Sequence, residues 1–327
     1  MLSKAKIKQI KALGIKKFRD EQGLFVAEGD KIVSCLLPSF ECEWVMASER
    51  WKGGMHERAN ARTGERGECT NARTGEGKKG GTDLIVVEAD ELRKVSFLKT
   101  PQEVLAVFRK PRYAIEEANP ALQLVLALDG IQDPGNLGTI IRIAEWFGIE
   151  HIICSLDTAD AFSPKTVQAT MGALANVKVL YSNLKEYILK NNASPVYGTF
   201  LEGENIFQSA LSQKGVIVMG NEGNGIRPEI EALINKKLYI PSYPPDCKTT
   251  GSLNVATATA IVCAEFRRKT HSPPVIVHFF CISSAGCHSG KYDERRHRIR
   301  SGKRIRIYVL RLKNLLYGRP LHNSRLL

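Results

Sequence analysis

Three polar segments of the sequence, each directly after a short apolar run, carry residue types that can do chemistry. The first contains Asn136 with Arg142 shortly after it, the second contains Glu222, and the third contains Ser252 and Asn254. An arginine beside a cluster of polar loop residues usually holds an anion, because its planar guanidinium keeps its charge. The pattern therefore indicates a site for an anionic ligand, with Arg142 as its buried-side cation.

The second segment is rich in glycine. Residues 220–225 (GNEGNG) follow an apolar run, and glycine lets a backbone approach a ligand closely. The spacing matches neither the dinucleotide-binding pattern GxGxxG nor a P-loop, GxxxxGK followed by Ser or Thr. Residues 286–291 (GCHSGK) are one residue short of a P-loop and precede Tyr292. We therefore exclude a nucleotide-dependent oxidoreductase and an NTPase.

Each of these polar residues also has a purely structural interpretation. Asn136 and Ser252 are both residue types that cap helix N-termini, and Asn254 then falls in a first helical turn. Glu222 is an acid that can pair with a helix N-terminus. Taken one segment at a time, the sequence leaves both interpretations open.

The elements that must position these residues form a regular series after residue 122. Short apolar runs alternate with helical patterns, which predicts a parallel α/β sheet whose ligands bind at the carboxyl ends of its strands. The expected strands are 124–128, 151–154, 176–180, 196–200, 215–219 and 237–240. The expected helices are 137–147, 183–190, 228–233 and 253–268.

The first third of the chain is less regular. A helical pattern covers 3–20, a strand 24–26 and a helix 28–37, and further strands are expected at 44–47, 84–88 and 104–109. We predict a small α/β domain over 1–110, a linker over 111–121 and a second domain over 122–269.

Two segments fit neither domain. Residues 53–82 contain the hexapeptide NARTGE twice and have almost no apolar content, which predicts a flexible insertion. Residues 270–327 hold 12 Lys/Arg and 2 Asp/Glu, whereas 1–269 hold 35 and 32. Most of the excess of +13 therefore lies in this tail, which is either a nucleic-acid-binding extension or, as we favour, one without a structured role.

Cysteine usage and hydropathy limit where the protein works. The eight cysteines include no CxxC pair, so we expect reduced, mostly buried thiols and no metal site. No apolar run approaches the ~20 residues of a membrane-spanning helix. Residues 1–13 (MLSKAKIKQIKAL) interleave lysines where a signal peptide needs an apolar run. We expect a cytoplasmic protein with no membrane partner.

Together and in this order, the three polar segments resemble the SpoU (TrmH-like) family of the SPOUT superfamily, the RNA ribose 2′-O-methyltransferases. The resemblance is carried by 133–138 (DPGNLG) with Arg142, by 219–225 (MGNEGNG), and by 240–241 (IP) with 252–255 (SLNV). Residues 163–165 (SPK) and 172–173 (GA) also match, so it covers about 122–269. Residues 25–29 (FVAEG) resemble the ribosomal-protein-like RNA-binding domain that often precedes this family's catalytic domain.

The resemblance implies a fold, a cofactor and partners. The fold would be a deep trefoil knot, in which the chain after Gly215 threads through an earlier loop, and the protein would be an obligate homodimer. The methyl donor would be S-adenosyl-L-methionine and the substrate RNA, with ribosomal RNA favoured over transfer RNA by the type of the N-terminal domain. The implied cofactor-binding residues are Gly220, Ile240, Leu253 and Thr199.

The resemblance also assigns catalytic residues. They are Arg142, Asn136, Glu222, Ser252 and Asn254. A general-base role for Arg142 conflicts with the permanent protonation of guanidinium groups. The alternative is that Arg142 holds a phosphate and stabilises the forming alkoxide, and both roles stay open.

Three other functions compete with ribosomal RNA ribose methylation. A transfer RNA ribose methyltransferase shares all the motifs. A knotted enzyme that methylates a base nitrogen is disfavoured, because such relatives use other residues where this chain has Arg142. A non-catalytic RNA-binding protein with a degenerate knot is disfavoured by the intact set of five polar residues.

Overall fold

The computed structural model describes residues 2–51, 83–244, 251–268, 294–298 and 304–308. The chain divides into two units, Met1–Arg267 and Arg268–Leu327. In the second unit, β11 (Glu294–Arg298) and β12 (Arg304–Tyr308) pair as antiparallel strands. The expected insertion at 53–82 and the rest of the basic tail after Arg268 lie outside the described residues.

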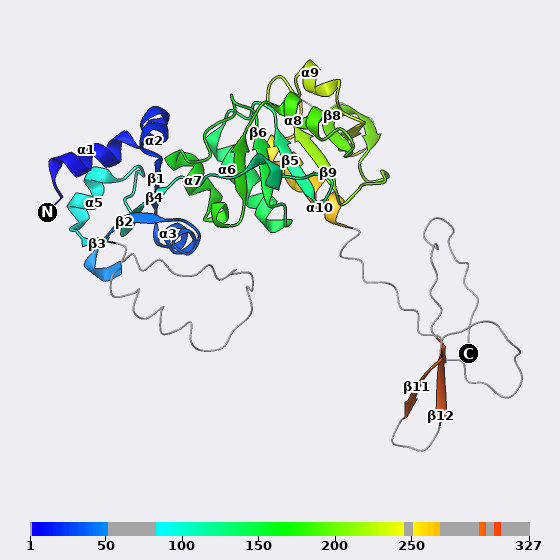
Figure 1. The fold of residues 1–327 in the computed structure, drawn as a ribbon, viewed down its shortest axis with the longest axis horizontal. Coiled ribbons are helices and arrows are strands. Elements are labelled where there is room, and N and C mark those ends of the chain that lie inside the picture. Colours follow the sequence, from blue (N-terminus) through cyan, green and yellow to red (C-terminus); the bar gives the residue numbers. More distant parts are fainter. Residues whose placement is uncertain (1, 52–82, 245–250, 269–293, 299–303, 309–327) are drawn as a thin grey trace, which may run out of the picture. The chain divides into compact units, whose positions relative to one another are not determined.

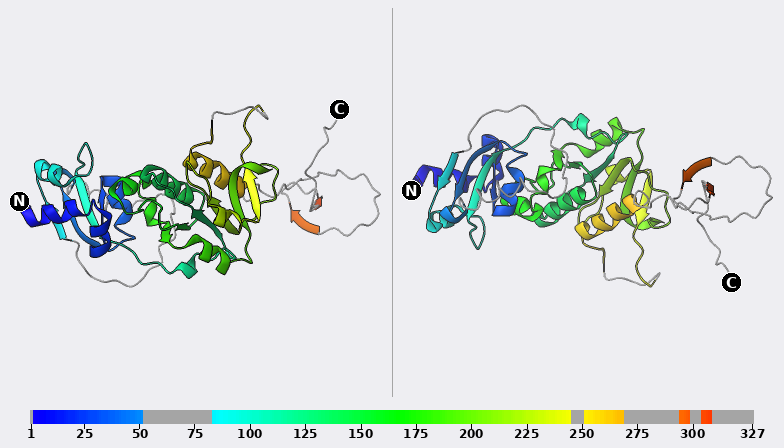
Figure 2. Two further views of the ribbon diagram at one scale, coloured as in Figure 1. Left: turned by 90° about the horizontal axis from the view of Figure 1, so that it is seen from above. Right: turned by 90° about the horizontal axis from the view of Figure 1, so that it is seen from below.

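The N-terminal part of the first unit contains a four-stranded sheet in the order β1-β4-β2-β3 (Figures 1 and 2). Helices α1 and α5 pack on one face of this sheet, and α3 packs on the other. The pairs are antiparallel except β2 with β3. The elements are α1 (Lys4–Ala12), α2 (Lys16–Gln22), β1 (Leu24–Glu28), α3 (Asp30–Leu36), β2 (Cys42–Ala47), β3 (Asp83–Val86), α5 (Ala89–Val95) and β4 (Val104–Arg109).

The helical pattern expected over 3–20 forms two helices, α1 and α2, with a turn between them. Helix α1 ends before Leu13, and α2 begins after Ile15. Between them, a Cβ on Gly14 would lie 2.8 Å from the ring of Phe97, so the chain turns where a glycine permits this close packing. Ile10 of α1 and Leu13 of the turn are fully buried against the sheet.

The second sheet has six strands, all parallel, in the order β10-β8-β9-β5-β6-β7. This confirms the predicted parallel α/β sheet. Its strands are β5 (Leu124–Leu128), β6 (His151–Cys154), β7 (Lys178–Tyr181), β8 (Val196–Asn205), β9 (Gly215–Met219) and β10 (Lys236–Tyr239). Strand β8 runs five residues further than predicted, and its pairing with β10 shifts register between Lys237 and Leu238.

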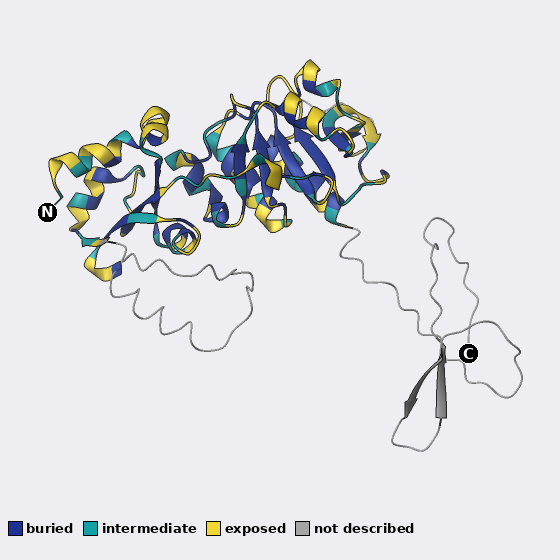
Figure 3. Ribbon diagram, in the orientation of Figure 1, coloured by how far each residue is buried: buried dark blue, intermediate teal, exposed yellow. Residues whose placement is uncertain are grey.

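Helices cover both faces of the six-stranded sheet, which explains its continuous apolar strands. Figure 3 shows these strands buried and the outer helix faces exposed. Helices α6 (Pro134–Trp146), α7 (Pro164–Thr170) and α10 (Val255–Arg268) pack on one face with the turn η2 (Ala173–Ala175). Helices α8 (Leu184–Lys190) and α9 (Pro228–Glu231) pack on the other with the turn η1 (Ile115–Glu117). The sequence analysis missed α5 and α7, two seven-residue helices too short to show clear amphipathic spacing.

The two sheets share one apolar core. Phe25 of β1 lies with its ring 4.9 Å from that of Phe162, which precedes α7. The same cluster of buried side chains continues through α3, α6 and α10. The N-terminal sheet is therefore packed against the second sheet's helices within the first unit.

Candidate active site

The loops that carry the predicted site residues begin side by side at the carboxyl edge of the second sheet. Leu128, the last residue of β5, pairs with Met219, the last residue of β9. The backbone N–H of Asp129 then donates to the carbonyl of Met219 at 2.9 Å, which holds the two loops together past the strands. Parallel α/β sheets bind their ligands at this edge.

The start of α6 presents the side chain of Asn136 to its neighbours. Asp133 is the N-cap, and its carboxylate accepts a hydrogen bond from the Asn136 backbone N–H at 2.8 Å. This bond and one from Lys165 lower the pKa of Asp133. The interpretation of Asn136 as the cap is wrong, because Asp133 fills that position and leaves the Asn136 amide available.

Asn136 joins three loops through its side chain. Its Nδ2 donates to Glu222 Oε1 at 2.9 Å, and its Oδ1 accepts from Asn254 Nδ2 at 3.0 Å. These residues come from the loops after β5, β9 and β10 respectively. The structure thus brings together three of the five predicted catalytic residues in one chain of hydrogen bonds, which we call the Asn136 triad.

Asn254 also caps the last helix. Its Oδ1 accepts hydrogen bonds from the backbone N–H groups of Ala256 and Thr257 at 3.0 and 3.3 Å. A cap at Ser252 is therefore wrong, and the structural interpretation of Asn254 as a cap is confirmed. Its catalytic role stays a prediction. Ser252 is exposed and forms no hydrogen bond with any other described residue. Residues 245–250 of the same loop lie outside the described range.

Arg142 is not part of the hydrogen-bonded Asn136 triad. It is exposed on α6, so the expectation of an arginine on the buried side is wrong. Six residues along an α-helix rotate a side chain by about 120° from the starting face, which explains why Arg142 and Asn136 diverge. Among the described residues, no hydrogen bond or ion pair joins Arg142 to the triad. Trp146, one turn further on, is 84% exposed.

Two of the four predicted cofactor-binding residues lie at the end of β9: Gly220 follows its last residue, and Thr199 of β8 lies beside that end. A Cβ on Gly220 would lie 2.4 Å from the backbone of Gly225, so this position requires glycine. Thr199 Oγ1 donates to the Val218 carbonyl at 3.4 Å. Ile240 is half-buried against the core, and Leu253 is 52% exposed.

Sequence reasoning missed the pair that anchors the glycine-rich loop. Asp129 is buried directly after β5, and Arg227 lies directly before α9. Arg227 Nε donates to Asp129 Oδ1 at 2.7 Å, and this hydrogen bond raises the pKa of Arg227. The only sequence signal for this pair is Asp129 at the end of an apolar strand, and nothing nearby in the sequence identifies Arg227 as its partner.

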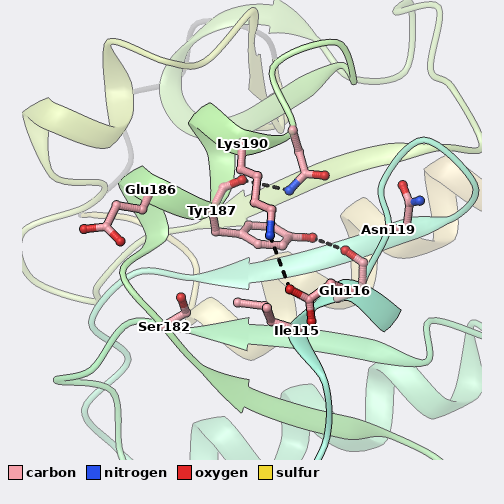
Figure 4. Close-up of a pocket in the computed structure, with 9 residues that line it drawn as sticks. Ile115, Glu116, Asn119, Ser182, Glu186, Tyr187 and Lys190 are labelled. Atoms are coloured by element: carbon pink, nitrogen blue, oxygen red, sulfur yellow. Dashed lines mark hydrogen bonds and ion pairs between the residues drawn. The ribbon is translucent and has the colours of Figure 1, made fainter.

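Other features of the described residues lie away from this edge. A pocket of about 390 Å³ is lined by residues of η1 and α8. Lys190 pairs with Glu116 there (Figure 4), and the Tyr187 hydroxyl donates to the Ala118 carbonyl. No predicted site residue lines it. Within the described ranges, no group of three or more His, Cys, Asp or Glu side chains is placed to hold a metal ion. Of the four cysteines in those ranges, Cys154 and Cys263 are buried, Cys42 is half-buried and Cys35 is exposed, so the expectation of mostly buried thiols holds only in part.

Comparison with known proteins gives the family. The sequence profile of the SpoU rRNA methylase family matches residues 123–264, and that of the MRM3-like substrate binding domain matches 4–106. The 23S rRNA (guanosine(2553)-2′-O)-methyltransferase RlmP of Bacillus subtilis is 30% identical over 267 residues, which is 80% of this chain and 96% of the relative. The chain belongs to the SpoU rRNA methylase family.

Solved structures of similar proteins agree with this assignment. An AdoMet-bound rRNA methyltransferase from Sinorhizobium meliloti is 29% identical with a TM-score of 0.68, covering 83% of this chain and 97% of that one. A TrmH-family protein from Porphyromonas gingivalis is 35% identical with a TM-score of 0.66, covering 82% and 99%. The predicted SpoU resemblance is confirmed. No helix among the described residues is both long and apolar enough to span a membrane.

Proposed function

We propose that this SpoU-family chain transfers a methyl group from S-adenosyl-L-methionine to a ribose 2′-hydroxyl of ribosomal RNA in the cytoplasm. The observation that carries the proposal is the Asn136 triad, which joins polar side chains of three loops at the carboxyl edge of the sheet. Support for the substrate and cofactor comes from the names of the B. subtilis and S. meliloti relatives.

The residues at the strand ends suit this cofactor. Its adenine needs apolar surface and backbone hydrogen-bonding groups. Ile240 and Leu253 would offer apolar side chains, and the glycine-rich turn that begins at Gly220 would offer backbone groups. The half-buried Thr199 adds a hydroxyl at the same edge. We assign these four residues to cofactor binding. When bound, S-adenosyl-L-methionine supplies a methyl group on a positively charged sulfur.

The protein's own contribution to the reaction is position and charge. The Asn136 triad holds amide and carboxylate groups where they orient the ribose hydroxyl, and Ser252 provides a further hydroxyl in the same loop as Asn254. Orientation of reacting groups is worth several kcal/mol in rate. Arg142, which stays protonated, binds the nucleotide phosphate and stabilises the oxygen as its proton is released to water.

A second copy of the chain would complete this site. In one chain Arg142 and Trp146 are exposed on α6, and Arg142 forms no hydrogen bond with the Asn136 triad among the described residues. A homodimer that covers this face of α6 would bury Trp146 and bring Arg142 to a neighbouring loop cluster. We further propose that the chain is knotted, as its resemblance to the SpoU family implies. The helix α10 packs beside α6, where Arg267 donates to the Phe147 carbonyl at 2.8 Å.

The N-terminal domain would bind the RNA substrate. We assign RNA binding to residues 1–110, a connection to 111–121 and methyl transfer to 122–269. Helix α1 carries four lysines and no acidic residue, and Lys4, Lys8 and Lys11 are exposed. Cationic side chains bind RNA by releasing counterions from its phosphates. The match of residues 4–106 to a substrate-binding domain supports the same assignment.

The function is tested with methyl-labelled S-adenosyl-L-methionine and RNA from a strain that lacks the protein. Ribosomal RNA, assembled ribosomal subunits and transfer RNA are incubated separately, and the nucleosides are analysed by mass spectrometry. We expect a labelled 2′-O-methyl nucleoside in ribosomal RNA or its subunits. Label in transfer RNA alone, label on a base nitrogen, or cofactor binding without transfer to any of these RNAs would each contradict the proposal and favour one of the three competing functions.

A further inference from the structure

An ion pair between buried Asp129 and the partly exposed Arg227 lies beside the loop that carries Glu222. The Asp129 side chain is fully buried, and both of its oxygens are held by Arg227. Oδ1 accepts from Arg227 Nε at 2.7 Å and contacts Nη2 at 2.5 Å, while Oδ2 accepts from the Arg227 backbone N–H at 2.8 Å. Side chain and backbone of one residue thus bind the same carboxylate.

Arg227 closes the far end of a tight turn, and Asn221 closes the near end. Asn221 and Gly225 exchange backbone hydrogen bonds at 2.9 and 3.0 Å, with Glu222 between them. Asn221 Nδ2 donates to the Gly130 carbonyl at 2.6 Å. The turn is therefore tied to residues 129 and 130 on both sides, and Glu222 projects from it to Asn136.

The ion pair is not explained by the stability of the sheet. The Arg227 side chain is 43% exposed, and an ion pair with an exposed partner is screened by solvent and adds little to stability. The β5–β9 ladder is already continued by the backbone bond from Asp129 to Met219. The pair fixes the orientation of Arg227 relative to Asp129, because a guanidinium group binds a carboxylate in a defined geometry.

We propose that Asp129 and Arg227 are positioning residues, which hold the turn at 221–225 so that the Glu222 carboxylate meets the Asn136 amide. The role of this contact in methyl transfer rests on the proposed function. The contact between Asp129 and Arg227, which we call the Arg227 clamp, is present in the chain without substrate or cofactor. Whether the clamp exists and whether it matters for catalysis can therefore be tested separately.

The first measurement is hydrogen exchange of the full chain, free of ligands, for Arg227→Gln and Arg227→Lys. We expect the amides of residues 223–225 to exchange at least about tenfold faster in Arg227→Gln, with a smaller change in Arg227→Lys, and the strands to keep their protection. Asp157→Asn is the matched control, because exposed Asp157 lies 3.7 Å from Arg227 and should leave the turn unchanged. Unchanged exchange in the turn, or faster exchange throughout the sheet, would overturn the proposal.

The second measurement asks whether Arg227 acts through Glu222. We expect Arg227→Gln to lower kcat by at least about tenfold with little change in KM for RNA, and to have no further effect once Glu222→Gln is present. Losses that multiply in the double variant would show that Arg227 acts independently of Glu222. If the wild-type protein methylates no RNA, the proposed function fails, while the exchange measurement still decides whether the clamp exists.

Discussion

Arg19 of α2 and Asp160 of the segment after β6 form a buried ion pair across 141 residues of sequence. Arg19 Nε and Nη2 lie 2.9 and 2.7 Å from Asp160 Oδ2, and the two side chains are 3% and 8% exposed. Arg19 Nη1 also donates to the Leu13 carbonyl at 2.7 Å. One guanidinium therefore links the turn between α1 and α2 to the helices of the second sheet.

We expect Arg19→Ala to lower the free energy of unfolding by about 3–5 kcal/mol, because Asp160 is left buried without its partner. Replacing both residues, as Arg19→Met with Asp160→Leu, should recover most of that loss. Denaturant unfolding of the three proteins measures this. A single variant within 1 kcal/mol of wild type, roughly the value of an exposed pair, would show that the bridge is weak.

Removing the hub of the Asn136 triad should affect catalysis far more than folding. Asn136→Ala removes both side-chain hydrogen bonds at a half-buried position, so we expect kcat to fall by about 100-fold with a small change in stability. Asn176→Ala is the matched control. Asn176 Nδ2 donates to the side chain of Glu145 on α6 at 2.6 Å, and neither residue belongs to the triad. Equal activity of the two variants would remove Asn136 from the catalytic machinery.

The cap of α6 should make stability depend on pH. The pKa of Asp133 is lowered in the folded protein, by the Asn136 N–H and then by Lys165. A lowered pKa contributes stability above the unfolded value, and that stability is lost as the pH falls through the folded pKa. Wild type should therefore exceed Asp133→Asn in stability at pH 6, and the difference should shrink progressively as the pH falls below the ordinary aspartate pKa of about 3.9. Urea unfolding of the two proteins across this pH range measures the difference in stability. A difference that does not change with pH would contradict the role of the Asp133 carboxylate as a charged cap.

The sequence predicted the second sheet better than the site. Continuous apolar strands such as Leu124–Leu128 reported burial on both faces, and the loops at their carboxyl ends followed from that. Helix boundaries and the residues between them were less visible: the Gly14 turn depends on Phe97, and the Arg227 clamp depends on Asp129. Each of these depends on a contact between distant residues, which local periodicity does not record.

Proximity within the site was also only partly predictable. Asn136, Glu222 and Asn254 meet because their loops follow strands β5, β9 and β10 to one edge of the sheet. Arg142 was grouped with them by sequence closeness to Asn136. Helical rotation instead places it on the exposed face of α6 with Trp146, where one chain supplies no partner among its described residues.

The exposed face of α6 should be the dimer contact. We expect wild type to elute as a dimer in size-exclusion chromatography with light scattering, and Trp146→Glu to elute as a monomer, because it places a charge in a buried apolar contact. Exposed Leu156→Glu outside α6 is the control and should remain dimeric. A dimer that survives Trp146→Glu would place the interface elsewhere.

Arg142 should be essential for turnover and dispensable for binding the cofactor. Arg142→Ala removes the cation assigned to the phosphate and the forming alkoxide, while the assigned cofactor residues lie on other loops. We expect methyl transfer to fall by more than 100-fold, with cofactor affinity by calorimetry nearly unchanged. Arg142→Lys keeps the charge without the planar fork, so its activity separates the need for charge from the need for bidentate geometry. An Arg142→Ala protein within about tenfold of wild type would show that Arg142 is not part of the active site.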